Sequence, residues 1–190
     1  YSSAASDVYK RQGEGVWMDS DKLRPDDEVG EVLKHGTLSI GFCGLAECLV
    51  ALTGHHHGED EASQELGLRI VGYIRNYCDE KSKQFGMNVT CLATPAESLA
   101  GRLLRADRKE FGIIKGVTDR EYYTNSFHVP VYYHLPALKK IDIEAPYHAL
   151  TNAGHISYVE LDGDPTKNLA AFERVVRPVS YTHLTLPTNR

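Results

Sequence analysis

The sequence has no excess of positive charge, no long apolar run and no leader-like start. Its 190 residues include 21 Lys and Arg against 26 Asp and Glu, which gives a formal net charge of -5. Without a basic stripe, a surface that coats nucleic acid is not expected. Without a run of about 18 apolar residues or a charged-then-apolar start, neither a membrane span nor a signal peptide is predicted. We therefore expect a cytoplasmic protein that binds no nucleic acid and no membrane.

Paired cysteines are also missing. The four cysteines are widely spaced and form no CxxC pair: Cys43, Cys48, Cys78 and Cys91. A zinc knuckle within this chain is therefore disfavoured, and buried reduced thiols are expected. Three histidines follow one another at 55–57, but neighbouring side chains point apart and cannot all ligate one metal from regular structure. We predict no metal site, and a polar loop there whose Asp60 caps the next helix.

The stretch from residue 87 to residue 102 carries the strongest local signal. An apolar, β-branched run up to Ala93 predicts a buried strand. Thr94 suits a helix N-cap, Pro95 suits the first helical position, and Glu97 would close a capping box. A strand that turns straight into a helix directs free N–H groups and a positive dipole end at one spot, which favours an anion site. The alternative is that this is only a well-capped helix of an α/β layer.

Further strands and helices alternate along the chain. The segment 122–131 combines hydrogen-bonding side chains with β-prone aromatic residues, so its strand end serves either a core network or a ligand. Alternating strands and helices predict an α/β protein with its chemistry at the carboxyl ends of the strands. The other elements expected are a strand at 37–42 with close backbone approach at Gly41, a helix at 45–52 ended by Gly54, a helix at 61–82, a helix from Thr94 with Leu99, Leu103 and Leu104 on its apolar face, a connection at 138–148, a half-buried strand at 155–161 and a helix at 165–176.

Both ends differ from the middle in composition and periodicity. Residues 1–12 (YSSAASDVYKRQ) and 178–190 (PVSYTHLTLPTNR) resemble translated adapter remnants. We expect both to be non-native tails, and residues 13–177 to be the natural protein.

Four separated motifs carry the functional information: GTLSIGFCGLAE at 36–47, LATPAES at 92–98, GVTDREYYTNSFH at 116–128 and NAGHISY at 152–158. In that order and spacing they resemble the C-terminal part of the barrel of anaerobic (class III) ribonucleoside-triphosphate reductases, which are glycyl radical enzymes. The resemblance covers essentially all of 13–177. It implies that residues 13–177 form part of a ten-stranded α/β barrel that is incomplete in this chain.

The resemblance also implies a radical reaction for the parent enzyme. A glycyl radical installed by an S-adenosylmethionine/iron-sulfur activase generates a thiyl radical, which starts the reduction of ribonucleoside triphosphates to deoxyribonucleoside triphosphates. Formate or a thiol reductant supplies the electrons. The family further implies a C-terminal structural zinc, ATP and dNTP effectors, and a homodimer.

Residue roles follow from the matching motifs. The helix start would hold the substrate's phosphates, with Glu97 contributing its backbone N–H because a carboxylate repels triphosphate. Glu47 would face the ribose, although a first-turn glutamate favoured by the helix dipole is an equal reading. The candidate catalytic or cavity-lining residues are Glu47, Asn125, Ser126 and His128. The candidate substrate-binding residues are Thr94, Pro95, Ala96, Glu97, Ser98, Asn152 and His155.

The chain also departs from the family's pattern. The family's thiyl-forming cysteine belongs upstream of residue 13, and its glycyl loop and zinc cysteines belong downstream of residue 177. Cys43 stands where the family more often has an aliphatic residue, so we interpret it as a packing residue. We therefore expect this fragment alone to be inactive. Two alternatives stay open: another glycyl radical enzyme of the pyruvate formate-lyase kind, and a non-catalytic nucleotide-binding module.

Overall fold

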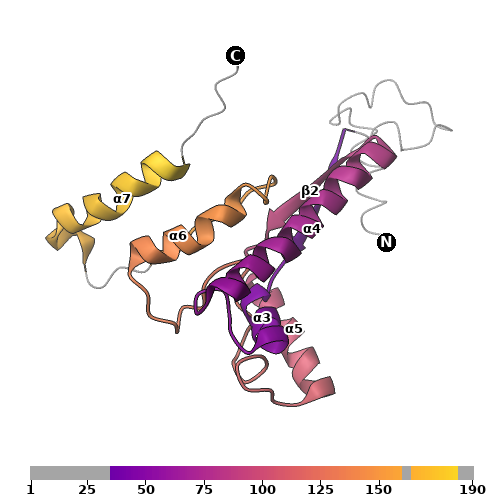
Figure 1. The fold of residues 1–190 in the computed structure, drawn as a ribbon, viewed down its shortest axis with the longest axis horizontal. Helices are drawn as coiled ribbons and strands as arrows, with labels where there is room; N and C mark the ends of the chain where they lie inside the picture. Colours follow the sequence, from indigo (N-terminus) through magenta and orange to yellow (C-terminus); the bar gives the residue numbers. More distant parts are fainter. Residues whose placement is uncertain (1–34, 160–163, 184–190) are drawn as a thin grey trace, which may run out of the picture.

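Two parallel strands form the centre of the structure. The computed structural model describes residues 35–159 and 164–183. Strand β1 (Thr37–Phe42) pairs in parallel with β2 (Asn88–Ala93), in a register that sets Thr37 opposite Asn88 and Phe42 opposite Ala93. Both predicted strands are confirmed. Because the pair is parallel, the carboxyl ends of both strands lie side by side, and the segments that follow Phe42 and Ala93 leave the sheet there (Figure 1).

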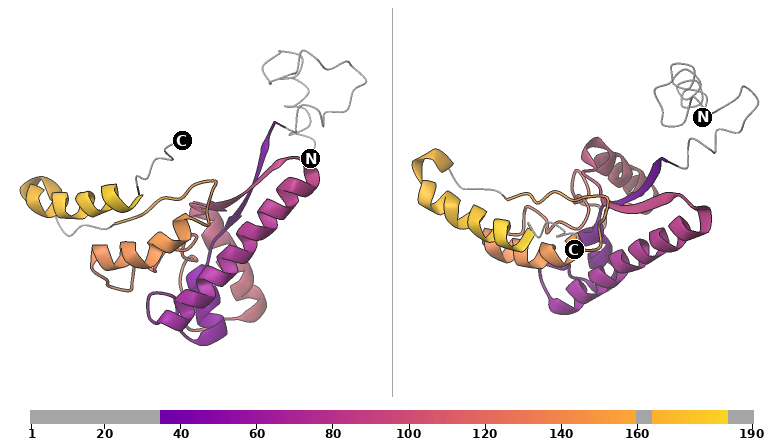
Figure 2. Two further views of the ribbon diagram at one scale, coloured as in Figure 1. Left: turned by 45° about the horizontal axis from the view of Figure 1, so that its top comes forward. Right: turned by 90° about the horizontal axis from the view of Figure 1, so that it is seen from above.

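Helices α3 (Leu45–Thr53) and α4 (Glu61–Phe85) form the crossover between the strands. Gly54 ends α3 in the left-handed region at φ 89°, as predicted. Asp60 caps α4 as predicted: one carboxylate oxygen accepts the Ser63 N–H at 2.9 Å and the other accepts the Ser63 hydroxyl at 2.8 Å. Helix α4 lies along the strands and is three residues longer than expected (Figures 1 and 2).

The core joins the crossover helices to β2 and to two later aromatic residues. Phe127 and Tyr147 stack with ring centroids 5.1 Å apart, and both are fully buried. Burial of each such large apolar side chain contributes roughly 1.5–3 kcal/mol. The buried cluster comprises Leu45, Leu49, Val71, Cys78, Val89, Cys91, Ala93, Phe127 and Tyr147.

Helix α5 (Glu97–Phe111) begins later than predicted. Its N-cap is Ala96, and no side chain caps it, so the predicted capping box of Thr94 and Glu97 is wrong. The Thr94 hydroxyl lies over Gly41 of β1 instead, where an added Cβ would sit 1.7 Å from it. The close neighbour at Gly41 is therefore a side chain and not the backbone that was predicted, and the Thr94 hydroxyl lies over β1 and does not cap the helix.

The buried face of α5 also differs from the prediction. Ala100, Gly101 and Leu104 are buried, whereas Leu99 and Leu103 are 45% and 42% exposed. Small residues face inward because the 121–122 backbone packs closely there: a Cβ on Gly101 would lie 3.5 Å from the Glu121 carbonyl oxygen.

Three later segments correct the sequence analysis. Residues 138–148 are not a connection but most of α6 (Ala137–His148), which contains Pro146. Residues 122–131 form an irregular loop with one bridge residue, Asn125, and 155–159 form no strand. Residues 160 and 161 of that expected strand lie outside the described residues. A 3-10 turn η2 (Pro165–Lys167) precedes α7 (Leu169–His183), which packs on α6 and projects away from the strands (Figure 2). The proposed tail at 178–190 therefore begins within α7, while 1–12 and 184–190 lie outside the described residues.

Candidate functional site

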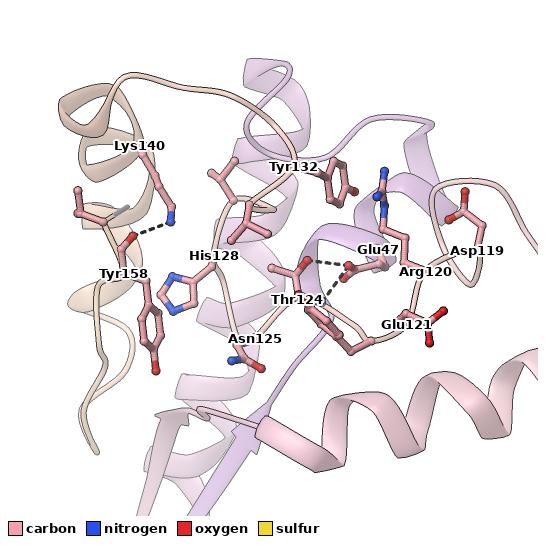
Figure 3. Close-up of a pocket in the computed structure, with 14 residues that line it drawn as sticks. Glu47, Asp119, Arg120, Glu121, Thr124, Asn125, His128, Tyr132, Lys140 and Tyr158 are labelled. Carbon is pink, nitrogen blue, oxygen red and sulfur yellow. Dashed lines mark hydrogen bonds between the residues drawn. The ribbon is translucent and has the colours of Figure 1, made fainter. Parts of the chain in front are cut away.

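A cavity of about 640 Å³ lies beside the carboxyl edge of the two strands (Figure 3). It brings together Glu47, Asn125 and His128, three residues that the sequence analysis named. The lining residues are Glu47, Asp119, Arg120, Glu121, Tyr122, Thr124, Asn125, His128, Val129, Val131, Tyr132, Lys140, Tyr158 and Val159.

Glu47 is a buried carboxylate in the first turn of α3 and is only 5% exposed. One oxygen accepts both the backbone N–H of Thr124, at 2.9 Å, and the Thr124 hydroxyl, at 2.7 Å. The other oxygen is buried and has no hydrogen-bond partner within the described residues. Burial raises the pKa of Glu47, and the two bonds from Thr124 only partly offset that shift. A buried polar atom without a partner costs free energy, so this oxygen is suited to contact a ligand.

The segment 122–131 reaches this edge as a loop held by backbone bonds. Gly44 N–H donates to the Thr124 carbonyl at 2.7 Å, and Cys43 forms an isolated antiparallel bridge with Asn125. Ser126 is buried, does not line the cavity, and holds a left-handed φ of 42°. The sequence analysis left open whether this polar segment serves the core or a ligand. Phe127 belongs to the core, and Asn125 and His128 line the cavity.

Opposite Glu47, the cavity wall consists of His128, Lys140 and Tyr158 (Figure 3). His128 Nδ1 lies 3.2 Å from a carboxylate oxygen of Glu144, which is 1% exposed. The other Glu144 oxygen accepts the Val129 N–H at 2.9 Å. Lys140 Nζ lies 3.8 Å from Glu144 and donates to the Tyr158 carbonyl at 2.6 Å. Glu144 was not predicted as a site residue, because the sequence of this segment was interpreted as a connection and not as α6.

Arg120 places a further cation at the cavity. Its guanidinium carbon lies 3.4 Å from the centroid of the Tyr132 ring, which is a cation–π arrangement. Arg120 and Lys140, together with Asp119 and Glu121, give the lining of the cavity side chains of both charge signs.

The start of α5 lies at the same sheet edge but does not line this cavity. None of the residues Thr94 to Ser98 is among the lining residues. Within the described residues, the backbone N–H groups of Ala96, Glu97 and Ser98 have no hydrogen-bond acceptor. Glu97 holds a left-handed φ of 42°, and Ser126 is the other described residue outside glycine with such a φ. Both are residues that the sequence analysis singled out, and such strain concentrates at functional sites.

Asn152 and His155 lie away from the cavity. Asn152 accepts the Cys91 N–H of β2 through its side-chain oxygen at 2.9 Å. His155 stacks on His148, with ring centroids 3.7 Å apart, and contacts the Thr151 hydroxyl at 3.3 Å. In this structure both residues support the backbone around β2 and α6.

The expected polar loop at 55–60 is present, but two of its histidines point inward. His56 and His57 are 3% and 2% exposed, whereas the His55 side chain is 63% exposed. His57 Nε2 lies 2.7 Å from the Phe127 carbonyl, to which it donates, and its Nδ1 has no partner within the described residues. Burial lowers the pKa of His57 to about 4, so the ring is neutral. Sequence spacing could not reveal this, because the partner lies 70 residues further along the chain.

No group of three or more His, Cys, Asp or Glu side chains in residues 35–159 and 164–183 is placed to hold a metal ion. No helix in this part of the chain is long and apolar enough to cross a membrane.

Comparison with known proteins identifies the family. The model of the family described as "Anaerobic ribonucleoside-triphosphate reductase" matches residues 2–187. The chain belongs to the anaerobic ribonucleoside-triphosphate reductase family. It is 40% identical over 166 residues to the reductase of that name from Escherichia coli (strain K12), covering 86% of this chain and 23% of that protein. It is 36% identical over 156 residues to the reductase from Enterobacteria phage T4, covering 81% and 24%.

A solved reductase structure supports the fold. The anaerobic ribonucleotide reductase from Thermotoga maritima, with glycerol in the active site, superimposes with a TM-score of 0.57 at 22% identity. The match covers 75% of this chain and 23% of that one. The α/β fold and its place as part of a larger reductase fold are therefore confirmed. The chain spans less than a quarter of the length of these relatives.

Proposed function

We propose that this chain is a piece of an anaerobic ribonucleoside-triphosphate reductase that reduces ribonucleoside triphosphates to deoxyribonucleoside triphosphates. In this proposal it supplies part of the substrate cavity and the phosphate-binding helix start. The observation that carries the proposal is the unpartnered, buried oxygen of Glu47 on a cavity at the carboxyl edge of parallel strands. In α/β folds ligands bind at that edge.

The start of α5 is the proposed phosphate site. The absence of a capping side chain leaves the N–H groups of 96–98 free, so an anion can accept hydrogen bonds that a capping box would have occupied. The positive end of the α5 dipole adds to the attraction. Glu97 and Ser98 are both exposed at this position, so triphosphate oxygens can reach their backbone.

The other candidate residues take separate parts. Glu47, Asn125 and His128 contact the sugar or the reductant in the cavity, while Ser126 shapes the loop that carries them. Asn152 and His155 hold the surrounding backbone and act on substrate only indirectly. Thr94 and Pro95 join β2 to α5 and set the direction in which the chain enters the helix. Both lie within residues 13–177, the part proposed to be the natural protein.

The parent enzyme's partners extend the proposal. Its glycyl radical, installed by an S-adenosylmethionine/iron-sulfur activase, supplies the radical chemistry, and a homodimer, a structural zinc and ATP/dNTP effectors complete it. None of the residues described here is assigned to hold these groups. The match to the reductase family argues against a pyruvate formate-lyase-like activity.

Nucleotide titration of the 190-residue chain tests the proposal. CTP is added to ¹⁵N-labelled protein while the backbone amide signals are recorded, and cytidine serves as the control without phosphates. We expect CTP to shift the amide signals of Glu97 and Ser98 strongly, and cytidine to leave them unchanged. If CTP binds without moving those two signals, or binds no better than cytidine, the phosphate assignment is wrong.

A further inference from the structure

One edge of the His128 ring faces a carboxylate and the other faces the cavity. Nδ1 lies 3.2 Å from a carboxylate oxygen of Glu144, in an ion-pair contact, and it makes no hydrogen bond within the described residues. The Tyr158 ring stands edge-on to the imidazole with centroids 5.1 Å apart, and Phe127 lies on another side at 5.2 Å. The ring is therefore enclosed on three sides, and its remaining edge lies toward the cavity (Figure 3).

Glu144 is itself fixed in place. One of its oxygens accepts the Val129 N–H at 2.9 Å, and Lys140 Nζ, 3.8 Å away, balances its charge. This leaves its second oxygen for His128. An ionised carboxylate oxygen has no proton to donate and attracts a positive hydrogen, so it favours the hydrogen on the nitrogen that faces it. In the neutral ring the other nitrogen, Nε2, is then an acceptor.

We propose that Glu144 is a positioning residue that holds His128 as the Nδ1–H tautomer, so that Nε2 accepts a hydrogen bond from a ligand hydroxyl in the cavity. The inference rests on the proposed function for the identity of that hydroxyl, which would belong to the ribose. The opposite tautomer would present an N–H donor, which suits a phosphate or carbonyl oxygen. Glu144 therefore sets which kind of group this wall of the cavity recognises, although it does not line the cavity itself.

The tautomer can be measured directly by ¹⁵N NMR of the histidine rings in the 190-residue chain at a pH where His128 is neutral. We expect a protonated Nδ1 and an unprotonated Nε2. Glu144→Gln should invert this pattern. Its amide oxygen keeps the bond from Val129 N–H, so its amide NH₂ faces His128 and donates to Nδ1. The matched control is Asp142→Asn, an exposed carboxylate on the same helix, which should leave the tautomer unchanged.

Titration with CTP then connects the tautomer to binding. The His128 Nε2 signal of the unmodified chain should shift on CTP addition, and Glu144→Gln should weaken CTP binding roughly tenfold, the cost of one lost hydrogen bond. A protonated Nε2 in the unmodified chain, or an unchanged tautomer in Glu144→Gln, overturns the inference. If CTP binds but leaves the Nε2 signal in place, the inference fails while the proposed function stands. If the tautomers behave as expected but CTP does not bind, the proposed function fails and the positioning role stands.

Discussion

The buried ring of His57 should make this protein less stable in acid. Its neutral form donates from Nε2 to the Phe127 carbonyl, and its Nδ1 has no described partner. The pKa of His57 is about 4 in the folded chain, below its ordinary value of 6.5. Because the unfolded chain binds the proton more tightly, His57 costs nothing above pH 6.5, and stability falls as the pH drops from 6.5 toward 4.

The size of this effect follows from the two pKa values. Between pH 7 and pH 5, His57 should lower the free energy of unfolding by about 2 kcal/mol. Other groups titrate in the same range, so the useful quantity is the difference between the unmodified chain and His57→Gln, whose amide can still donate to the Phe127 carbonyl. That difference, measured by urea unfolding at both pH values, should change by about 2 kcal/mol in favour of the variant at pH 5.

His55→Gln is the matched control for this experiment. Its ring lies two residues away in the same loop and is 63% exposed, so its replacement should leave the pH dependence unchanged. If His57→Gln follows the same pH dependence as the unmodified chain, His57 is not a buried neutral ring, and its account as a support behind the site is refuted.

Three further predictions concern stability. Glu47→Gln should stabilise the chain at pH 7 by about 1 kcal/mol, because burial raises the pKa of Glu47 and disfavours its ionised form. The stability that this carboxyl contributes is fully present below pH 4.5 and is lost as the pH rises through the folded pKa. The gain measured by urea unfolding should therefore shrink at pH 4. Gly41→Ala should lower stability by about 2 kcal/mol, because the new Cβ would lie 1.7 Å from the Thr94 hydroxyl. Gly72→Ala has open space on α4 and should raise stability by about 0.5–1 kcal/mol. Equal thermal midpoints for the two variants would contradict the packing of Thr94 on β1. Asp60→Ala should lower the free energy of unfolding by about 1 kcal/mol, because it removes the N-cap of α4, and Thr94→Ala should lower it by less. The reverse order in chemical unfolding would indicate that Thr94 caps α5 after all.

Local patterns predicted the elements whose cause is local. The strands at 37–42 and 88–93, the Asp60 cap and the stop at Gly54 all follow from neighbouring residues, and the structure confirms each. The failures have distant causes. The Thr94 hydroxyl lies against Gly41 of the other strand. The small residues of α5 are buried because the backbone at 121–122 lies against them.

The same distinction applies to the candidate site. The motif residues Glu47, Asn125 and His128 do meet at one cavity, and their types were enough to suggest it. Glu144 and His57 could not be found from motifs, because each acts through a residue 16 or 70 positions away along the chain, His128 for Glu144 and Phe127 for His57. Each of these two residues is buried and makes one contact with a residue distant in sequence, and residue spacing does not predict such a contact.

The hydrogen bond from Cys91 N–H to Asn152 covers one edge of the two-stranded sheet and, within the described residues, leaves the other edge open. On the side of β2 that faces away from β1, Val89 N–H donates to the Ser82 hydroxyl, Cys91 N–H to Asn152 and Ala93 N–H to the Gly154 carbonyl. This edge is therefore closed to a further strand, whereas no strand within residues 35–159 and 164–183 pairs with the outer edge of β1. The outer edge of β1 therefore offers free backbone groups to one more strand, which in the parent barrel can be a neighbouring strand. Two copies of this chain could also pair with each other through this edge.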